Sequence, residues 1–485
     1  MKKQKVLTPE QIRKQNLRRE REIARWEKEK ARPKRNYYIV YLIFIIALIY
    51  AIDEIASQIG TLMKTEIAND LFNTENSASL LDLLSGLAVP FQAIGLLYRP
   101  FADRWGRKLF LIINTFGMSF ALLIVYLSDN IPLYFIGACI VQFFIPHDMH
   151  VVYIMESSPP KHRARIYSSI KFFANIAVMI VPVLRDKLMA DVSQWRNVYI
   201  IPAFVGIAVC FVALLCARET DAFIESRLNH LRKTPEELEA EKKAQNEASR
   251  QGGLIPALKF AMKHKQLKWL YIVSSVANLG FIASINYPIV LNYGYAQNML
   301  NSGLAATLEE AVATVGVTTY TEAIFLYPLG LAIAQVIMGF ISDWKGRKAA
   351  AVTTAFNCVA SYVLFSLGAY LNWDPYITGF FCGAAIGSYY STNDVIIMMI
   401  GESSPTNLRS SAMSAQFIVT AVGFVLSFAL SMPFTLTIGN TAMAACCFAL
   451  LVPGFAAALL LLIKKTHDTT GIDMDTVTGT EWDGK

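Results

Sequence analysis

The sequence has little charge for its length. Only 17% of its 485 residues are Asp, Glu, Lys or Arg, against about 25% in soluble domains. Residues 1–36 and 218–268 hold 19 charged side chains each and residues 464–485 hold 8, which leaves 35 for the other 376 residues. So few charges cannot keep several soluble domains in solution, and 54% of the residues are hydrophobic. The composition therefore predicts an integral membrane protein.

The sequence patterns of pumps and metalloenzymes are also missing. There is no GxxxxGK[ST] phosphate loop, which argues against a primary pump, and no HExxH motif. His147 and His150 could supply two metal ligands, but two ligands without a third are a weak metal signal. The seven cysteines lie in apolar stretches without a CxxC pair, which is typical of packing residues. We therefore expect no enzyme, no metal and no cofactor.

The first 36 residues are strongly basic, with 14 Lys and Arg against 5 Asp and Glu, and they lead directly into an apolar segment at Tyr37. A basic segment beside a membrane span typically faces anionic lipid on the cytoplasmic side. No aromatic stacking platform accompanies this charge, so we expect no nucleic-acid partner. An apolar run that begins only after 36 polar residues does not fit a cleavable signal peptide.

Apolar segments of the length that crosses a bilayer, about 20 residues, occur twelve times. They begin near Tyr37, Leu80, Leu109, Ile131, Ile166, Val198, Leu267, Thr319, Ala349, Pro375, Ser411 and Thr441. The predicted fold is all-α and integral to the membrane, with twelve transmembrane helices. With both termini inside, the cytoplasmic side receives 39 of the 44 basic residues, as the positive-inside rule requires. The outer side receives Lys64, Arg185, Lys187 and Arg196.

The polar segment 218–266 divides the spans into two sets of six. The predicted units are a basic cytoplasmic arm (1–36), an N-terminal six-helix half (37–217, the N half), a cytoplasmic linker (218–266), a C-terminal six-helix half (267–463, the C half) and a cytoplasmic tail (464–485). Thr8-Pro9-Glu10 in the arm and Thr234-Pro235-Glu236-Glu237 in the linker are typical helix starts. We expect the two helices to be solvated and peripheral.

Two motifs occur once in each half. Asp103-Arg104-Trp105-Gly106-Arg107-Lys108 is matched 240 residues later by Asp343-Trp344-Lys345-Gly346-Arg347-Lys348. Asp148 precedes Glu156-Ser157-Ser158-Pro159 and Arg163, and at an offset of 246 Asp394 precedes Glu402-Ser403-Ser404-Pro405 and Arg409. Two matches in equivalent loops indicate an internal repeat, and therefore two pseudo-symmetric halves.

These loops resemble the signature loop of the major facilitator superfamily, and the Glu-x6-Arg repeats resemble its sugar-porter-like branch. Arg218-Glu219-Thr220 after span six and Asp468-Thr469-Thr470-Gly471 after span twelve resemble the family's Pro-Glu-Thr-Lys-Gly more weakly. The resemblance covers roughly residues 37–471. It implies a rocker-type transporter that works as a monomer. In the first loop, Arg99 stands where the family usually has Gly.

The resemblance further implies a cytoplasmic gate built from the charged loops, in which Arg107 and Arg347 meet Glu156 and Glu402. Its candidate residues are Asp103, Arg104, Arg107, Glu156, Arg163, Asp343, Arg347, Glu402 and Arg409. Alternating access requires an interface that breaks, which favours a conformational latch. The alternative is a static clamp.

Ionisable residues inside the spans are costly, about 2.5–3.5 kcal/mol each on the insertion scale, so each requires a role or a partner. The proton-coupling candidates are Asp53, Glu54, Asp148 and Asp394. Proton-coupled members of the resembled family carry a carboxylate near the position of Asp53. Glu54 lies about 100° further around the helix, so we expect only one of the two to face the cavity, and prefer Asp53. Alternatively, the carboxylates are satisfied by neighbours and carry no protons.

Polar side chains within the spans supply a candidate solute site, made of Lys171, Asn175, Asn286, Asn292, Tyr389, Asn393, Gln416 and Thr420. Sugar facilitators typically carry Gln where Lys171 stands, and a cation in a cavity wall favours an anion. Lys171 could instead pair with Asp148 or Asp53. Ser284-Ile285-Asn286 is close to the family's Gly-Ile-Asn, but Gly280 and Phe281 occupy the places of its Gln-Gln pair, which argues against a hexose.

The sequence thus predicts a secondary active transporter in the cell membrane that moves a small polar solute by alternating access and proton symport. The solute is a sugar, a sugar acid or a related organic anion. Alternatives with the same fold are a facilitated-diffusion uniporter and a proton-antiport exporter, although residues 166–184 lack the glycines typical of antiporters. From other classes, a transport-inactive nutrient sensor and a membrane-embedded enzyme remain alternatives.

Overall fold

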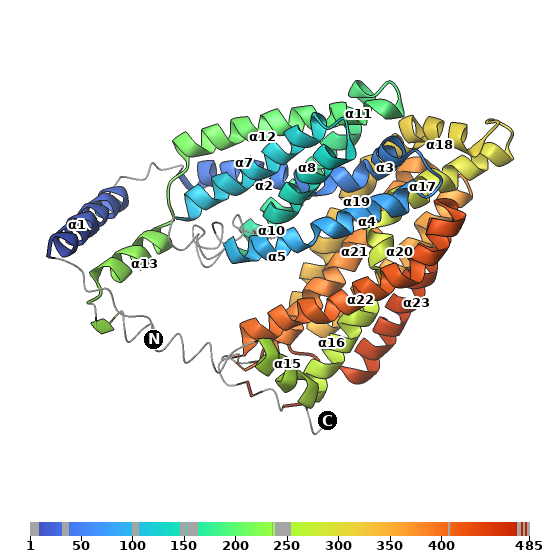
Figure 1. Cartoon of the computed structure of the whole chain (residues 1–485). Helices are drawn as coiled ribbons and strands as arrows, with labels where there is room; N and C mark the ends of the chain where they lie inside the picture. Colours follow the sequence, from blue (N-terminus) through green and yellow to red (C-terminus); the bar gives the residue numbers. More distant parts are fainter. Residues whose placement is uncertain are drawn as a thin grey trace.

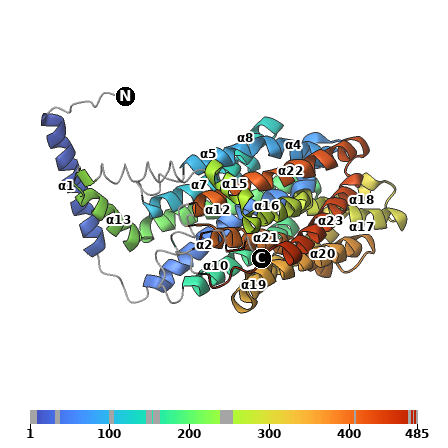
Figure 2. The same cartoon turned by 90° about the horizontal axis from the view of Figure 1, so that it is seen from below.

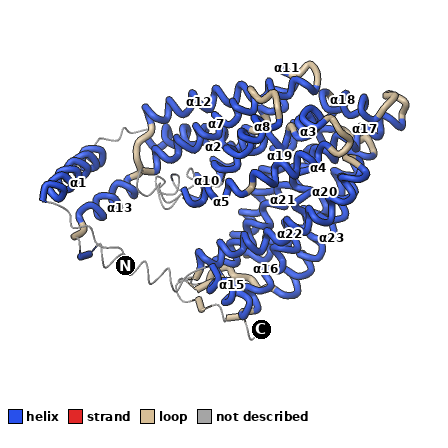
Figure 3. Tube along the Cα trace, in the orientation of Figure 1, coloured by secondary structure: helices blue, strands red, loops and turns tan. Residues whose placement is uncertain are grey.

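The computed structural model describes residues 9–31, 38–98, 106–145, 153, 163–234, 236–237, 254–405, 408–472, 477–478 and 481–482. Helices and their connections make up this described part, and Figure 3 draws no strand in it. The bilayer explains this architecture. Backbone N–H and C=O groups find no water in the hydrocarbon core, so each apolar segment pairs them internally as a helix.

The N half follows the order of the predicted spans. Its helices are α2 (Tyr38–Leu62), α3 (Lys64–Phe72), α4 (Ser77–Ala88), α5 (Pro90–Tyr98), α7 (Arg107–Tyr126), α8 (Ile131–Phe144), α10 (Arg163–Ala177), α11 (Ile180–Leu188), η3 (Val192–Arg196) and α12 (Asn197–Cys216). Span two is divided into α4 and α5 just before Pro90, whose nitrogen carries no hydrogen for the helical ladder. Span five is likewise divided, into α10 and α11.

The C half contains α16 (Lys265–Ala277), η4 (Asn278–Gly280), α17 (Phe281–Asn301), α18 (Leu308–Val317), α19 (Thr319–Lys345), α20 (Arg347–Tyr370), α21 (Pro375–Glu402), α22 (Arg409–Ile438) and α23 (Thr441–Lys465), and α15 (Leu254–Lys263) precedes it. Within the described residues, eight helical segments are long and apolar enough to cross a membrane. Predicted spans two, four, five and ten are not among them. Two of these are interrupted, span four runs into residues outside the description, and α21 carries many polar side chains.

Small residues allow α19 and α21 to pack closely. A Cβ added to Gly379 would lie 1.5 Å from the carbonyl oxygen of Ala323, and one added to Gly383 would lie 1.9 Å from that of Tyr327. These glycines are four residues apart, so they lie on one face of α21 and let the two backbones touch, as small residues do between membrane helices.

The two halves meet most closely at one end of the bundle. In Figure 1 the helices of both halves approach each other where α3, α11 and α18 lie, and they spread apart toward α13 (Asp221–Arg232) and α15. We name the end with α3, α11 and α18 the outer end and the opposite end the cytoplasmic end, following the orientation that the basic residues predict.

The arm helix α1 (Pro9–Ala31) packs against α13 of the linker, and the pair stands apart from the bundle (Figures 1 and 2). Ion pairs Arg227–Glu22 and Arg232–Glu27, both 2.7 Å, join the two helices. Between them lies a small apolar cluster of Trp26, Phe223, Ile224 and Leu228. The expectation that the arm helix is solvated was therefore incomplete, because α1 buries its apolar face on α13. The linker helix expected from Thr234 is a different segment, and its solvation stays a prediction.

Both predicted helix starts are present. Helix α1 begins at Pro9, and Thr8 lies outside the described residues. In the linker, the N–H of Glu237 donates to the Thr234 hydroxyl at 3.3 Å, while the N–H of Thr234 donates to the Glu237 carboxylate at 2.7 Å. This reciprocal capping box lowers the pKa of Glu237, because hydrogen bonds from Thr234 stabilise its ionised form.

Candidate functional site: the interface between the halves

A buried ion pair lies at the outer end of the interface. Arg185 of α11 is 1% exposed and donates to the carboxylate of Glu66 in α3 at 2.5 Å. The same guanidinium donates to the carbonyl of Gly316 at 2.6 Å and to the hydroxyl of Thr321 at 3.3 Å, and it lies 4.9 Å from the ring centre of Tyr320. Arg185 and Glu66 belong to the N half and the other three residues to the C half, so the guanidinium bridges the halves.

A second buried pair has the same plan. Lys64 of α3 forms an ion pair with Asp82 of α4. Lys64 also donates to the carbonyl of Ile285 at 3.1 Å, and the Asn286 amide donates to Asp82 at 2.8 Å. The pair therefore contacts two consecutive residues of α17 in the other half.

Neutral hydrogen bonds complete the outer contact. Asn292 donates to the hydroxyl of Thr65 at 3.0 Å, and the Tyr320 hydroxyl donates to the carbonyl of Leu62 at 2.7 Å. Asn440 precedes α23. Its backbone N–H donates to the carbonyl oxygen of Glu75 at 2.6 Å, and its side-chain amide donates to the hydroxyl of Ser77 at 2.9 Å. Together with the ion pairs, these contacts hold the outer ends of the halves together.

The sequence analysis placed Lys64 and Arg185 on the outer side without predicting their burial, and it missed Asp82 and Glu66. One signal was available: Asp82 falls inside the predicted second span, which begins near Leu80. Asn286 and Asn292 were predicted to bind solute. In this structure both side chains instead contact the N half.

Charged and amide groups of the two halves also meet along α10. Lys171 lies 4.0 Å from the carboxylate of Asp394 in α21, and the two side chains are 29% and 41% exposed. One turn further along α10, Asn175 donates to Gln335 of α19 at 2.9 Å. Asp394 is a partner for Lys171 that the sequence did not suggest. Of the two suggested partners, Asp148 lies outside the described residues.

A polar network runs through the inside of the C half, and it connects three of the predicted solute residues. Tyr389 donates to the Asn278 side-chain oxygen at 2.6 Å, and the Asn278 amide donates to Asn393 at 2.8 Å. Gln416 donates to Ser274 at 2.7 Å, and Ser274 accepts from Asn278 through its carbonyl. Asn278, at the η4 break in span seven, was missed by the sequence analysis.

The hydrogen bond that the Thr420 side chain forms is local and does not belong to this network. Its hydroxyl donates to the carbonyl of Phe417 one turn earlier, at 2.9 Å. This local bond is common for Thr inside helices.

The first-span carboxylates point in different directions. Asp53 accepts from the Thr115 hydroxyl of α7 at 3.2 Å, a contact within the N half. Glu54 accepts from the Gln58 amide one turn further along α2. The preference for Asp53 as the carboxylate that faces the cavity stays a prediction.

The cytoplasmic charges of the C half form one cluster. Arg347 meets Glu402 at 3.0 Å, as expected, and Asp343 at 3.5 Å. Glu402 also accepts from Thr469 of the tail at 2.5 Å. Arg409 donates to the carbonyl of Gly401 at 3.0 Å. These contacts all lie within the C half and its tail.

The tail also caps α20. The backbone N–H of Lys348 donates to Asp468 at 2.8 Å, and the Lys348 ammonium donates to the carbonyls of Ile463 and Thr466. Gly346, at a φ of +98°, leaves room for this carboxylate, because an added Cβ would lie 2.5 Å from it.

The N half repeats this cap. The backbone N–H groups of Arg107 and Lys108 donate to Glu219 at 2.9 and 3.1 Å, and the Lys108 ammonium donates to the carbonyl of Leu214. Gly106 has a φ of +108°. Burial raises the pKa of Glu219, and the backbone hydrogen bonds only partly oppose this. Glu219 and Asp468 belong to the two segments after spans six and twelve that weakly resemble the family's Pro-Glu-Thr-Lys-Gly.

Three predicted gate residues of the N half, Asp103, Arg104 and Glu156, lie outside the described residues. Arg99, which stands where the family usually has Gly, lies outside them as well. Arg163 begins α10, and its side chain is not described. The structure therefore describes the cytoplasmic cluster of the C half in more detail than that of the N half.

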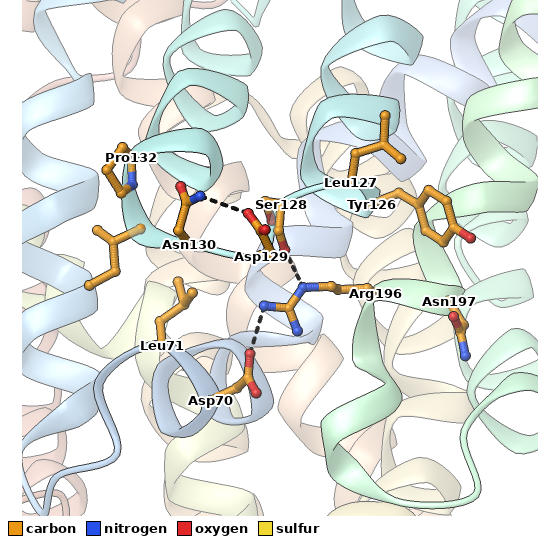
Figure 4. A pocket seen from close by; sticks show the side chains of 11 residues that line it. Asp70, Leu71, Tyr126, Leu127, Ser128, Asp129, Asn130, Pro132, Arg196 and Asn197 are labelled. Carbon is orange, nitrogen blue, oxygen red and sulfur yellow. Dashed lines mark hydrogen bonds and ion pairs between the residues drawn. The ribbon is translucent and has the colours of Figure 1, made fainter.

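A shallow depression of about 980 Å³ lies at the outer end of the N half. Figure 4 shows Arg196 between the carboxylate of Asp70, 2.8 Å away, and the carbonyl of Ser128, with Asp129 and Asn130 nearby. All of its lining residues belong to the N half. The depression therefore lies away from the interface between the halves.

The fold and this interface define a multi-pass membrane transporter built from two six-helix halves. The family model of the Major Facilitator Superfamily matches residues 42–428, and the chain belongs to this family. No curated protein sequence matches the chain.

Solved structures with the same fold include two sugar transporters. The inward-open xylose transporter XylE from E. coli is 14% identical, with a TM-score of 0.60 over 91% of this chain and 99% of that one. A D-xylose-proton symporter is 16% identical, with a TM-score of 0.56 over 89% and 99%. An inward-facing bacterial homologue of the human lysosomal transporter Spinster is 14% identical, with a TM-score of 0.55 over 89% and 96%.

Proposed function

We propose that the chain is a secondary active transporter that carries a small polar solute across the cell membrane by alternating access. The observation that best supports this is the Lys171–Asp394 pair. Charged groups of opposite halves face each other at 4.0 Å, and both are partly exposed. A partly exposed charge pair within the span region offers polar groups to a solute.

The proposed solute class is a sugar acid or a related organic anion, with a neutral sugar as the next candidate. Lys171 supplies the positive charge, and Asn175 and Gln335 supply amides along the interface. Asn393, next to Asp394 in the chain, supplies a further amide from inside the C half. Amides that both donate and accept suit the hydroxyls of a polyol. The fold shared with two xylose transporters agrees with a sugar-like solute.

We further propose that transport is coupled to proton symport. Two carboxylates within the spans are the first choices: Asp394, which lies 4.0 Å from Lys171 of the N half, and Glu54, which accepts from Gln58 in α2. A carboxylate that alternately faces the two sides of the membrane can take up a proton on one side and release it on the other. Asp53 is the second choice, since its hydrogen bond to Thr115 stays within the N half.

Uptake into proteoliposomes tests this proposal. D-Gluconate, D-glucuronate and D-xylose would each be supplied with and without an inside-alkaline pH gradient. We expect the gradient to stimulate uptake of a sugar acid, and Glu54→Gln to remove that stimulation. Lys171→Gln should lower uptake of the anions roughly tenfold more than uptake of D-xylose. Lys187→Gln, at an exposed position, is the matched control.

Each alternative gives a different result. If the uptake rate is the same with and without the pH gradient, in both the native protein and Glu54→Gln, the protein is a uniporter. Solute movement against the proton flow indicates an antiport exporter. Equal loss of anionic and neutral solutes in Lys171→Gln contradicts the proposed solute class, and no uptake of any solute in a well-folded preparation indicates a sensor.

A further inference from the structure

Within the part of the chain that the structure describes, the outer end of the interface contains four buried charges, and all four belong to the N half. Lys64 and Glu66 lie on α3, Asp82 on α4 and Arg185 on α11. Among the described residues, the groups of the C half that they contact are neutral: two backbone carbonyls, the Asn286 amide, the Thr321 hydroxyl and the Tyr320 ring. When the halves separate at this end, no positive charge has to leave its negative partner.

This arrangement lowers the cost of opening. Separation of two opposite charges in a low-dielectric interior is strongly unfavourable. Here separation breaks only hydrogen bonds between a charge pair and neutral groups, and water replaces the lost partners on both sides. The closed state is still specific, because Lys64 and Asp82 contact two consecutive residues, Ile285 and Asn286.

Asn286 is the residue of the C half whose side chain this pair holds. It belongs to the Ser284-Ile285-Asn286 motif of span seven, and its amide nitrogen donates to Asp82 and to the carbonyl of Ile282 in this structure. Its side-chain oxygen is buried without a hydrogen-bond partner. While the outer end is closed, the amide nitrogen of Asn286 therefore donates to Asp82, and its amide oxygen accepts no hydrogen bond.

We propose that the Lys64–Asp82 pair positions Asn286 during transport: it holds the amide while the outer end is closed and releases it to the solute when the halves separate there. Both charges stay paired on the N half throughout. The Glu66–Arg185 pair, which starts two residues further along α3, repeats the arrangement and closes the same end. This inference rests on the proposed alternating access, but on neither the identity of the solute nor the coupling to protons.

Thiol labelling from the outer side tests the proposal without any solute. Thr65→Cys is the reporter, because Thr65 is 3% exposed and contacts Asn292 of the C half. Cys216 and Cys446, the native cysteines that are not buried, are replaced by Ala. A membrane-impermeant maleimide is added to oriented proteoliposomes, and the labelling rate is measured.

We expect Asp82→Asn to raise the labelling rate roughly tenfold, since a buried unpaired Lys64 destabilises the closed state. Asn286→Leu should raise it as well. The double variant should match Asp82→Asn alone, because both substitutions break one contact and are not additive. Asp70→Asn is the matched control: Asp70 pairs with Arg196 within the N half, so labelling should not change.

Additive effects of Asp82→Asn and Asn286→Leu would overturn the proposal, and so would unchanged labelling in Asp82→Asn. If Asp82→Asn does not fold, Lys64→Met/Asp82→Leu places a matched apolar pair in the same buried site. In that background Asn286→Leu should leave labelling unchanged, and a rise as large as in the native protein would contradict the proposal. Failure of sugar-acid uptake with these labelling results intact would refute the solute class alone.

Discussion

Ion pairs of similar chemistry occur at both ends of the interface, but their surroundings differ. At the outer end, Arg185 and Glu66 are buried and the guanidinium reaches into the other half. At the cytoplasmic end, Arg347 and Glu402 are partly exposed and stay within the C half, and Asp343 is 86% exposed. Buried charges are costly to leave unpaired, whereas exposed pairs contribute about 0–1 kcal/mol. The outer contacts therefore determine how stably the halves are held together in this state, and the cytoplasmic pair organises one half.

The largest expected effect comes from breaking the outer pair. Arg185→Gln leaves Glu66 buried without its cation, and we expect a loss of about 3–5 kcal/mol in the free energy of unfolding. The apparent Tm in detergent measures this loss. Lys187→Gln, two residues along α11 with 74% of its side chain exposed, should leave the Tm unchanged. Equal losses for the two variants would contradict the importance of burial.

The second-largest loss in the free energy of unfolding is expected from changes to the backbone of the cytoplasmic loops. Gly346→Ala and Gly106→Ala place a Cβ at a positive φ and against the carboxylates of Asp468 and Glu219, respectively. We expect each to lower the free energy of unfolding by about 1–3 kcal/mol because of the backbone conformation, and by more where the carboxylate loses its bond to the helix N-terminus. Gly339→Ala is the control, since its added Cβ meets nothing within 4 Å. Unequal losses between Gly106 and Gly346 would show that the two caps are not equivalent.

The smallest effect is expected at the exposed end of the cytoplasmic cluster. Asp343→Asn should change the free energy of unfolding by less than about 1 kcal/mol, because its carboxylate is largely solvated. Glu402→Gln should cost more, since Glu402 accepts from both Arg347 and Thr469. Thermal unfolding of both variants in one detergent compares them. A larger loss in Asp343→Asn would indicate that Asp343 has a further partner in the unliganded protein.

The latch predicted from the loop motifs stays a prediction. The contacts of Arg347 and Glu402 lie within one half, which agrees both with a latch in its released state and with a static clamp. Cytoplasmic cysteine labelling in Asp343→Asn distinguishes them, since only a latch predicts a change in accessibility.

Several features could be read from the sequence because short segments encode them. A run of about 20 apolar residues forms a span wherever it occurs, and the repeated Gly-Arg-Lys loops begin α7 and α20 in equivalent positions. The contact between Arg347 and Glu402 was expected only through the family resemblance that the repeated motifs carry, and the structure contains it. The helix starts at Pro9 and Thr234 follow from local capping.

Other features depend on how distant segments meet, and only the tertiary structure decided them. Lys64 lies just beyond α2, where the sequence is equally consistent with an exposed loop charge and a buried one. Its burial follows from α4 and α17, which bring Asp82 and Asn286 to it from 18 and more than 200 residues away. The partner of Lys171 depends in the same way on α21, which carries Asp394. Local patterns thus determined the helices and their ends, whereas the pairing of charges inside the membrane required the packed arrangement, because a buried charge is tolerated only where a partner from another helix reaches it.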